Sequence, residues 1–177
     1  NFMTTLHSVR ILSTDAILAH LDTLCDILEN SVNGGASVSF MLPFGREKAA
    51  LFWQKVARSV AADERIVLAA FDGAEQLQGT VQLVIDQPEN QDHRADVAKL
   101  LVHDRARRQG IARLLMRELE TVAAKHGKSV LVLDTATGSG AETFYTQCGW
   151  QRVGEIPRYA LMPDGEMTGT TLFYKFL

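Results

Sequence analysis

The segment HDRARRQGIARLLM, residues 103–116, contains the pattern that decides the fold. Arginines and a glutamine precede Gly110, and an apolar pattern with helical spacing follows it. The preceding residues AKLLV, at 98–102, have the apolar character of a strand. The segment therefore predicts a strand, a tight turn and a helix that begins at Gly110.

The turn before this helix is a candidate site for phosphate groups. A helix N-terminus presents unpaired backbone N–H groups and a partial positive charge, which together attract anions. Gly110 has no side chain, so a phosphate can approach the backbone closely. The guanidinium groups of Arg107 and Arg108 can grip phosphate oxygens. An ordinary solvated turn is the alternative interpretation.

Two familiar phosphate-binding loops do not fit the turn. A P-loop needs Gly-Lys-Ser/Thr, whereas Ile111 follows Gly110. A Rossmann loop needs the pattern GxGxxG, and this turn has one glycine. If the turn binds phosphate, it therefore does so as neither of these loops.

The pattern on either side of the segment predicts an α/β fold with a mixed sheet. The segments 96–103 and 129–134 are strands joined through the helix, so we expect them to be parallel neighbours. The earlier strands are expected to form an antiparallel meander. In chain order we expect strands at 6–12, 65–73, 77–86, 95–103, 129–135, 150–156 and 170–177, and helices at 13–33, 46–62, 110–126 and 141–149.

Composition excludes several classes of protein. The 177 residues suit one domain, and a net charge of −3 argues against a general nucleic-acid binder. No apolar run is long enough to cross a membrane, and the first residues lack the pattern of a signal peptide. Cys25 and Cys148 form neither a disulfide framework nor a metal-binding pattern. We therefore expect a cytoplasmic protein with no metal, no nucleic-acid partner and no membrane partner.

Two motifs resemble those of one enzyme family. Arg107 to Ala112, RRQGIA, resembles the acetyl-CoA loop of the Gcn5-related N-acetyltransferases, which reads Arg/Gln-x-x-Gly-x-Gly/Ala between a strand and a helix. ETFYTQCGW, residues 142–150, resembles the family's late Phe-Tyr motif, and the order of elements agrees over roughly residues 6–177. Gly138 stands where members often carry Asn, so the cofactor contact of that Asn is not expected here.

The resemblance implies a specific architecture. A mixed, mainly antiparallel sheet is expected, with a central parallel strand pair splayed around acetyl-CoA and helices on both faces. One N-acetyltransferase domain is expected over residues 3–177, with Asn1 and Phe2 a cloning remnant before Met3. Members are often dimers, so the resemblance allows a homodimer.

A narrower resemblance concerns the acceptor. GGASVSFM, residues 34–41, and PRYALMPDGEM, residues 157–167, which leads into TTLFYKFL, are similar to the tabtoxin-resistance acetyltransferases. Those enzymes acetylate the amino group of a β-lactam toxin. This similarity implies an amino-acid-like toxin or antibiotic as acceptor.

The resemblance also assigns cofactor-binding residues. The strand residues Leu100, Leu101 and Val102 would hold the pantetheine arm through free backbone groups. The turn would hold the pyrophosphate through Arg107, Arg108, Gln109, Gly110, Ile111 and Ala112. Tyr145 matches the tyrosine that donates a proton to the departing CoA thiolate, although a core tyrosine beside Phe144 is the alternative.

Two carboxylates are candidate general bases. Asp134 ends a buried strand at its carboxyl end, where ligands of open α/β sheets bind, and Asp96 begins the neighbouring strand. Either could take the proton of an attacking amine, directly or through water. The alternative for each is a strand-end residue that caps the backbone.

The glycine-rich loop after the first helical segment is a candidate acceptor site. Gly34 and Gly35 allow close approach, and Ser37 and Phe40 could wall a pocket; a tight packing loop is the alternative. The sequence thus favours acetyl transfer from acetyl-CoA to a primary amine of a small molecule. A peptide or protein N-acetyltransferase and a non-catalytic acyl-CoA sensor remain alternatives.

Overall fold

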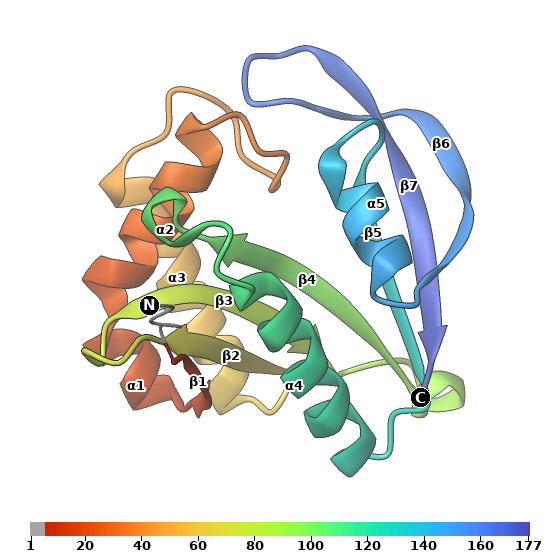
Figure 1. Ribbon diagram of the computed structural model, residues 1–177, viewed down its shortest axis with the longest axis horizontal. Coiled ribbons are helices and arrows are strands. Elements are labelled where there is room, and N and C mark those ends of the chain that lie inside the picture. Colours follow the sequence, from red (N-terminus) through yellow and green to blue (C-terminus); the bar gives the residue numbers. More distant parts are fainter. Residues whose placement is uncertain (1–5) are drawn as a thin grey trace, which may run out of the picture.

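The computed structural model describes residues 6–177, which form one seven-stranded sheet flanked by helices (Figure 1). The strands lie in the order β1-β2-β3-β4-β5-β7-β6, so the sheet is mixed, as predicted. Along the chain the elements are β1 (Ser8–Leu12), α1 (Thr14–Ala19), α2 (Leu21–Asn33), α3 (Arg46–Ala61), β2 (Arg65–Phe71), β3 (Leu77–Val84), the 3₁₀ turn η1 (Glu89–Gln91), β4 (Arg94–Val102), the 3₁₀ turn η2 (Asp104–Ala106), α4 (Ile111–Lys125), β5 (Val130–Ala136), α5 (Gly140–Gln147), β6 (Gln151–Leu161) and β7 (Met167–Phe176).

The sheet is covered on both faces, and each face has its own core. One face packs against α4, whose buried residues include Ile111, Leu115 and Leu119. The opposite face packs against α1, α2 and α3, where Trp53 is fully buried. Alternate residues of β2 point into the two cores, which explains why the whole strand reads as an apolar run.

The parallel pair predicted from the strand–helix–strand pattern is present, but it is short. β4 pairs with β5 over Arg94–Val130, Ala95–Leu131 and Asp96–Val132. Beyond Asp96 the two strands separate, while β5 stays paired with β7 along its full length, to Ala136. The sheet therefore opens at the carboxyl ends of β4 and β5 (Figure 1).

A bulge in β4 accompanies this opening. Gln82 of β3 pairs with Ala98, whereas Thr80 pairs with Leu101, so β4 contains one more residue than β3 in this interval. Lys99 lies in the bulge with φ +55°, a left-handed conformation that is uncommon for a residue with a side chain. Such bulges bend a strand and redirect its side chains, and here the redirected side chain is that of Lys99.

Gly79 allows α4 to lie close to the sheet. A Cβ atom at this position would come within 3.0 Å of Ile111 Cγ2 and 3.1 Å of the Leu101 carbonyl oxygen. The missing side chain lets the first turn of α4 pack directly on β3, beside the bulged part of β4. The start of α4 is thereby fixed relative to the opening.

Several ends differ from the sequence predictions; β7, for example, begins at Met167 rather than at residue 170, and two further differences have a clear physical reason. The expected helix over 13–33 is two helices that meet at His20, whose ring lies edge-on to Phe71 at 5.3 Å. Apolar spacing continues across His20, so periodicity does not reveal the break. β6 extends past Pro157 to Leu161, because it is an edge strand and a second bulge between Ile156 and Ala160 accommodates the proline.

No helix within residues 6–177 is both long enough and apolar enough to span a membrane. The same residues contain no cluster of three or more His, Cys, Asp or Glu side chains placed to hold a metal ion.

Candidate active site

A cavity of about 460 Å³ lies between the start of α4 and the open edge of β4. Its lining includes most of the residues predicted to bind the cofactor: Leu100, Leu101, Val102, Arg107, Arg108, Gly110, Ile111 and Ala112. Gln109 lies in the same turn but does not line the cavity. The opened strand and the sequence motif that follows it in the chain thus form one concave surface.

The turn that closes this cavity has the backbone conformation of an anion cradle. Arg108 and Gly110 both have positive φ, +63° and +76°. Gly110 is the N-cap of α4. Its carbonyl oxygen accepts the first hydrogen bond of the helix, from the backbone N–H of Leu114 at 3.0 Å. The N–H groups of Ile111, Ala112 and Arg113 in the first turn therefore have no acceptor within the helix. A Cβ atom on Gly110 would meet nothing within 4 Å, so it would project into open space.

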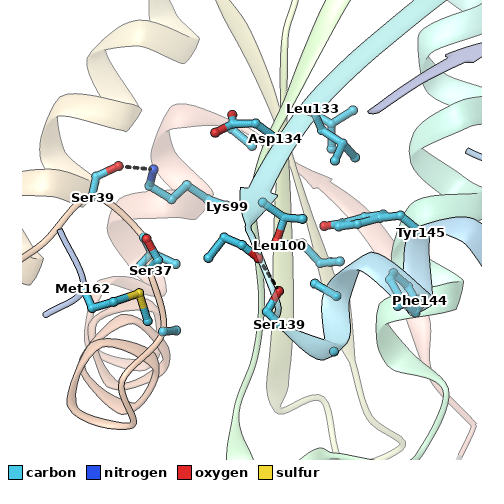
Figure 2. A pocket seen from close by; sticks show the side chains of 18 of the residues that line it. Ser37, Ser39, Lys99, Leu100, Leu133, Asp134, Ser139, Phe144, Tyr145 and Met162 are labelled. Carbon is cyan, nitrogen blue, oxygen red and sulfur yellow. Dashed lines mark hydrogen bonds between the residues drawn. The ribbon is translucent and has the colours of Figure 1, made fainter. Parts of the chain in front are cut away.

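A second cavity, of about 550 Å³, lies in the opening between β4 and β5 (Figure 2). We call it the central cavity. Lys99 of β4, Asp134 of β5 and Tyr145 of α5 line it, as do Gly35 and Ser37 of the loop after α2. It shares Leu100 and Phe144 with the cavity at the start of α4, so the two cavities are neighbours along the opening.

Tyr145 is a buried residue whose hydroxyl group faces the opening. Its ring packs against Phe144, Trp150 and Phe173, with ring centroids 5.2 to 6.1 Å apart, and Figure 2 shows the hydroxyl pointing toward Leu100. Burial, with smaller effects of Cys148 and Asp134, raises the pKa of the phenol to about 12. The ring therefore belongs to the core, as one interpretation of the sequence expected, and the residue also lines the central cavity; its role as a proton donor stays a prediction.

Asp134 is held by its neighbour on β7. Thr170 Oγ1 donates to Asp134 Oδ2 at 2.7 Å; Thr170 pairs with Ala136, two residues after Asp134, so the two side chains are diagonal neighbours on one face of the sheet. Within residues 6–177, Oδ1 of the same carboxylate accepts no hydrogen bond. One oxygen thus orients the group, and the other is left without a hydrogen bond from the described residues.

Asp96, the other predicted base, lies outside both cavities. Its carboxylate accepts hydrogen bonds from Arg94 at 2.5 Å and from Gln87 at 3.1 Å. It sits where β4 and β5 are still paired, and only the part beyond this pair is open. The structure brings Asp134 and Tyr145 together and leaves Asp96 in a surface ion pair.

Lys99 is a residue that sequence reasoning missed. Its ammonium group donates to Ser39 Oγ at 3.1 Å, and burial lowers the pKa of the amine while Asp134 partly offsets that effect. In the sequence it reads as one lysine within an apolar strand, AKLLV. Only its position in a bulge, which depends on the register with β3, directs it into the cavity.

A third cavity, of about 340 Å³, continues from the central cavity toward β6 and β7. We call it the side cavity. Ser37, Ser39 and Asp134 belong to both, and Tyr159, Thr168 and Thr170 contribute hydroxyl groups. Tyr159 lies in the bulge of β6 between Ile156 and Ala160, in a part of the strand that the predicted boundary at residue 156 left out.

The loop 34–45 forms one wall of these cavities. The backbone N–H of Leu42 donates to the Pro163 carbonyl oxygen at 2.9 Å, which joins the loop to the turn between β6 and β7. Of the residues predicted to bind the acceptor, Gly35 and Ser37 line the central cavity. Gly34 instead caps α2, and Phe40 packs against Phe44 and Phe52. These two belong to the support of the loop.

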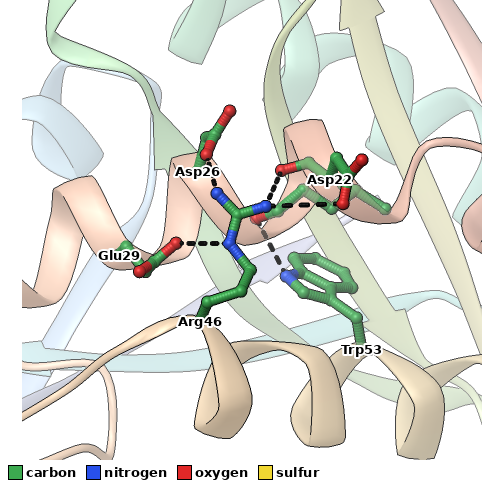
Figure 3. A network of polar contacts seen from close by, with 6 residues as sticks. Asp22, Asp26, Glu29, Arg46 and Trp53 are labelled. Carbon is green, nitrogen blue, oxygen red and sulfur yellow. Dashed lines mark hydrogen bonds and ion pairs between the residues drawn. The ribbon is translucent and has the colours of Figure 1, made fainter.

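An ion-pair network holds the far end of the loop (Figure 3). Arg46, the first residue of α3, bonds Glu29 Oε2 of α2 at 2.9 Å and also contacts Asp26 and Asp22. Below it, the indole N–H of Trp53 donates to the Leu24 carbonyl oxygen at 3.0 Å. Trp53 is therefore a core residue, and α2 and α3 keep both ends of the loop at a set separation.

Residues 35–150 match the sequence family described as "Acetyltransferase (GNAT) family". The matched region contains the turn at Gly110, Asp134 and Tyr145. The chain belongs to the GNAT family of acetyltransferases.

Solved structures share the GNAT fold over nearly the whole chain. ACIAD1637 from Acinetobacter baylyi ADP1 has a TM-score of 0.82 at 17% identity, covering 100% of this chain and 95% of that one. The ribosomal-protein-alanine N-acetyltransferase of Brucella melitensis has a TM-score of 0.78 at 21% identity, covering 96% and 99%. The Salmonella typhimurium protein yncA, solved with its cofactor acetyl-CoA, has a TM-score of 0.78 at 14% identity, covering 98% and 95%. At these identities the likeness shows the fold.

The environment of Tyr145 predicts a late titration. Because the folded chain raises the phenol pKa from 10.0 to about 12, the neutral phenol is favoured by folding. This contribution to stability is complete below pH 10 and is lost as the pH rises toward 12. In ultraviolet tyrosinate titrations of the folded protein, the difference between wild type and Tyr145→Phe should show a single step near pH 12. A step at the ordinary tyrosine pKa would contradict the burial.

Proposed function

We propose that this GNAT enzyme transfers an acetyl group from acetyl-CoA to a primary amine of a small molecule. The observation that carries the proposal is the opening between β4 and β5. It has an anion cradle at one end and the Asp134 and Tyr145 side chains at the other, in cavities that meet at Leu100 and Phe144. A binding site with a phosphate end and an acid–base end suits a nucleotide thioester and an amine acceptor.

The cavity at the start of α4, which contains the anion cradle, is the proposed binding site of acetyl-CoA. The first-turn amides of α4 and the side chains of Arg107 and Arg108 would hold the pyrophosphate. The open edge of β4 around Leu100 to Val102, which has no strand partner on the β5 side, would bond the amides of the pantetheine arm. Bound acetyl-CoA supplies an acetyl group activated as a thioester. The acetyl-CoA complex of yncA, which has the same fold, supports this assignment.

Asp134 would act as the base, directly or through water. An alkyl amine has a pKa near ~10 and is protonated at neutral pH, so a proton must be removed before or during attack. Thr170 holds one carboxylate oxygen, the other accepts no hydrogen bond from the described residues, and the residue lines the central cavity. A backbone N–H on the open edge of β4 would stabilise the charge that develops on the carbonyl oxygen.

Tyr145 would donate to the departing thiolate. Its raised pKa, about 12, keeps the phenol protonated at neutral pH. It also makes complete proton transfer to a thiolate less favourable than the ordinary tyrosine value suggests. The contribution we expect is therefore a hydrogen bond that strengthens as the sulfur becomes negative.

We call the central cavity and the side cavity the acceptor side of the opening. The acceptor would be small, because the loop 34–45 and the β6–β7 turn cover this side. The bond between Leu42 and Pro163 ties the loop 34–45 to the β6–β7 turn, and Met162 of that turn lines the central cavity. A long peptide would have to displace this contact. An amino-acid-like toxin, which the resemblance to the tabtoxin-resistance enzymes implies, is of suitable size.

The direct test is a screen of primary amines with acetyl-CoA, measuring CoA release and product mass. Acetylation of free small amines supports the proposal. Acetylation restricted to peptides or proteins would favour a peptide N-acetyltransferase. Tight acetyl-CoA binding without turnover on any amine or peptide would favour an acyl-CoA sensor.

Gly110→Ala should weaken acetyl-CoA binding by roughly tenfold or more, because the new methyl group projects into the space that the pyrophosphate would use. Gly110→Val should weaken it further. Equilibrium binding of acetyl-CoA, measured by calorimetry, checks both variants.

Gly127 provides the matched control at the other end of α4. Its φ is +75° and a Cβ would also meet nothing within 4 Å, so Gly127→Ala carries the same backbone strain, about 1 kcal/mol. Binding should remain within about twofold of wild type. Equal effects of the two variants would mean that strain, rather than phosphate contact, explains the loss.

Asp134→Asn should lower kcat/KM by roughly 10²-fold near neutral pH, with partial recovery at high pH as the free amine becomes neutral. Asp96→Asn is the control, because that carboxylate is bound to Arg94 and Gln87 outside the cavities. A pH–rate profile for each variant makes the measurement. Wild-type rates in Asp134→Asn at all pH values would remove this residue from the chemistry.

Tyr145→Phe keeps the ring packing and removes the donor. We expect unchanged acetyl-CoA affinity and a kcat lower by roughly 10- to 10³-fold, since the lost hydrogen bond forms mainly in the transition state. Single-turnover kinetics should be used so that chemistry is measured. An unchanged single-turnover rate would leave Tyr145 with a packing role alone.

A further inference from the structure

Two side chains of opposite charge line the acceptor side without forming an ion pair with each other or with other described residues. Among the described residues around the central cavity, Lys99 and Asp134 are the charged ones, and around the side cavity Asp134 is the charged one. Neither takes part in any ion pair within residues 6–177, although the two charges lie close enough to influence each other. The cavity thus offers one ammonium and one carboxylate group, each with capacity for a charged partner.

The backbone of Lys99 is strained, and this strained conformation directs the side chain into the central cavity. Lys99 and Ser39, which are joined by a hydrogen bond of 3.1 Å, both have positive φ, +55° and +79°. Residues with side chains rarely adopt this conformation, and when they do so side by side the surrounding structure must impose it. Figure 2 shows Lys99 and Asp134 extending toward the side of the cavity where Ser39 lies, while Tyr145 approaches from the other side.

Lys99 belongs to the acceptor side rather than to the cofactor side. It does not line the cavity formed by the cradle, whereas its neighbour Leu100 lines both. Burial lowers the pKa of its amine, which means that the charged form lacks full solvation. A bound anion would restore that interaction, and Ser39 alone supplies only a neutral acceptor.

From this placement we infer that the acceptor is an amine that also carries a carboxylate, with Lys99 as the anchor for the carboxylate and Asp134 facing the amine. The inference rests on the proposed function, because it describes the acceptor of that reaction. The rest of the molecule would enter the side cavity, where hydroxyl groups of Ser37, Thr168 and Thr170 favour a small polar group. The acceptor class is therefore that of small polar amino acids.

The experiment compares amino acids with the amines that result from removing their carboxylate. Serine with ethanolamine, histidine with histamine and tyrosine with tyramine are suitable pairs, assayed with wild type and with Lys99→Met, which keeps the length of the side chain. Wild type should prefer the amino acid of at least one pair by roughly 10- to 100-fold in kcat/KM, the loss expected for a charge-assisted hydrogen bond. Lys99→Met should abolish that preference, because it should lower kcat/KM for the amino acid far more than for the matching amine, and it should leave acetyl-CoA affinity unchanged.

Two further variants separate the anchor from other roles of the lysine. Lys99→Arg, which keeps the charge, should restore part of the preference. Lys55→Met, an exposed position on α3, is the surface-charge control and should behave as wild type. An equal loss for both members of a pair in Lys99→Met would indicate a role in the chemistry and would overturn the anchor.

Equilibrium binding makes the inference independent of turnover. The same pairs should be titrated into the protein saturated with CoA, for wild type and Lys99→Met. If wild type binds the amino acid more tightly than the matching amine and Lys99→Met removes this difference, the anchor is supported. If the same protein shows no turnover, the proposed catalysis is contradicted while the anchor stands. Equal binding of both members of every pair to wild type would overturn the anchor, whether or not acetyl transfer occurs.

Discussion

The short pairing between β4 and β5 is the constraint on which the rest of the site depends. These parallel strands share only three residue pairs and then separate, although each stays bonded to its other neighbour. An unpaired strand edge inside a sheet exposes backbone donors and acceptors that need partners. An extended ligand with amide groups can satisfy them, so the opening in the sheet is at once a gap in its hydrogen bonding and a binding surface.

The two sides of the opening have different chemistry because different elements build them. The α4 side consists of a helix N-terminus, arginines and apolar strand residues, which suits a polyanion with an uncharged arm. The opposite side consists of Lys99, Asp134 and hydroxyl groups from the loop 34–45 and β7. The ion pair of Arg46 with Glu29 holds that loop at its far end, and the hydrogen bond from Leu42 to Pro163 ties it to the β6–β7 turn. Other elements therefore fix this wall of the acceptor side in place.

Several features were predictable because they depend on residues near one another in the chain. The strand, the turn at Gly110 and α4 follow from local spacing, and the parallel pairing follows from the crossover that α4 makes. Tyr145 was predictable from its motif, and Asp134 from its position at the end of an apolar strand. The break at His20 was not, because apolar spacing continues across it, and the extent of β6 was not, because Pro157 reads as the end of a strand.

The sequence by itself determined the mixed α/β fold, the strand, turn and helix around Gly110, and membership of the GNAT family, since each depends on residues close together in the chain. Only the tertiary structure decided that Asp134 lines the opening and Asp96 does not, because β4 and β5 are still paired at Asp96 and separate beyond it. It also turned Lys99 toward Ser39 and packed the half-buried Phe40 against Phe44 and Phe52. The physical reason is that a bulge and a strand separation arise from register between distant segments, and a shift of one residue sends a side chain to the other face of a sheet.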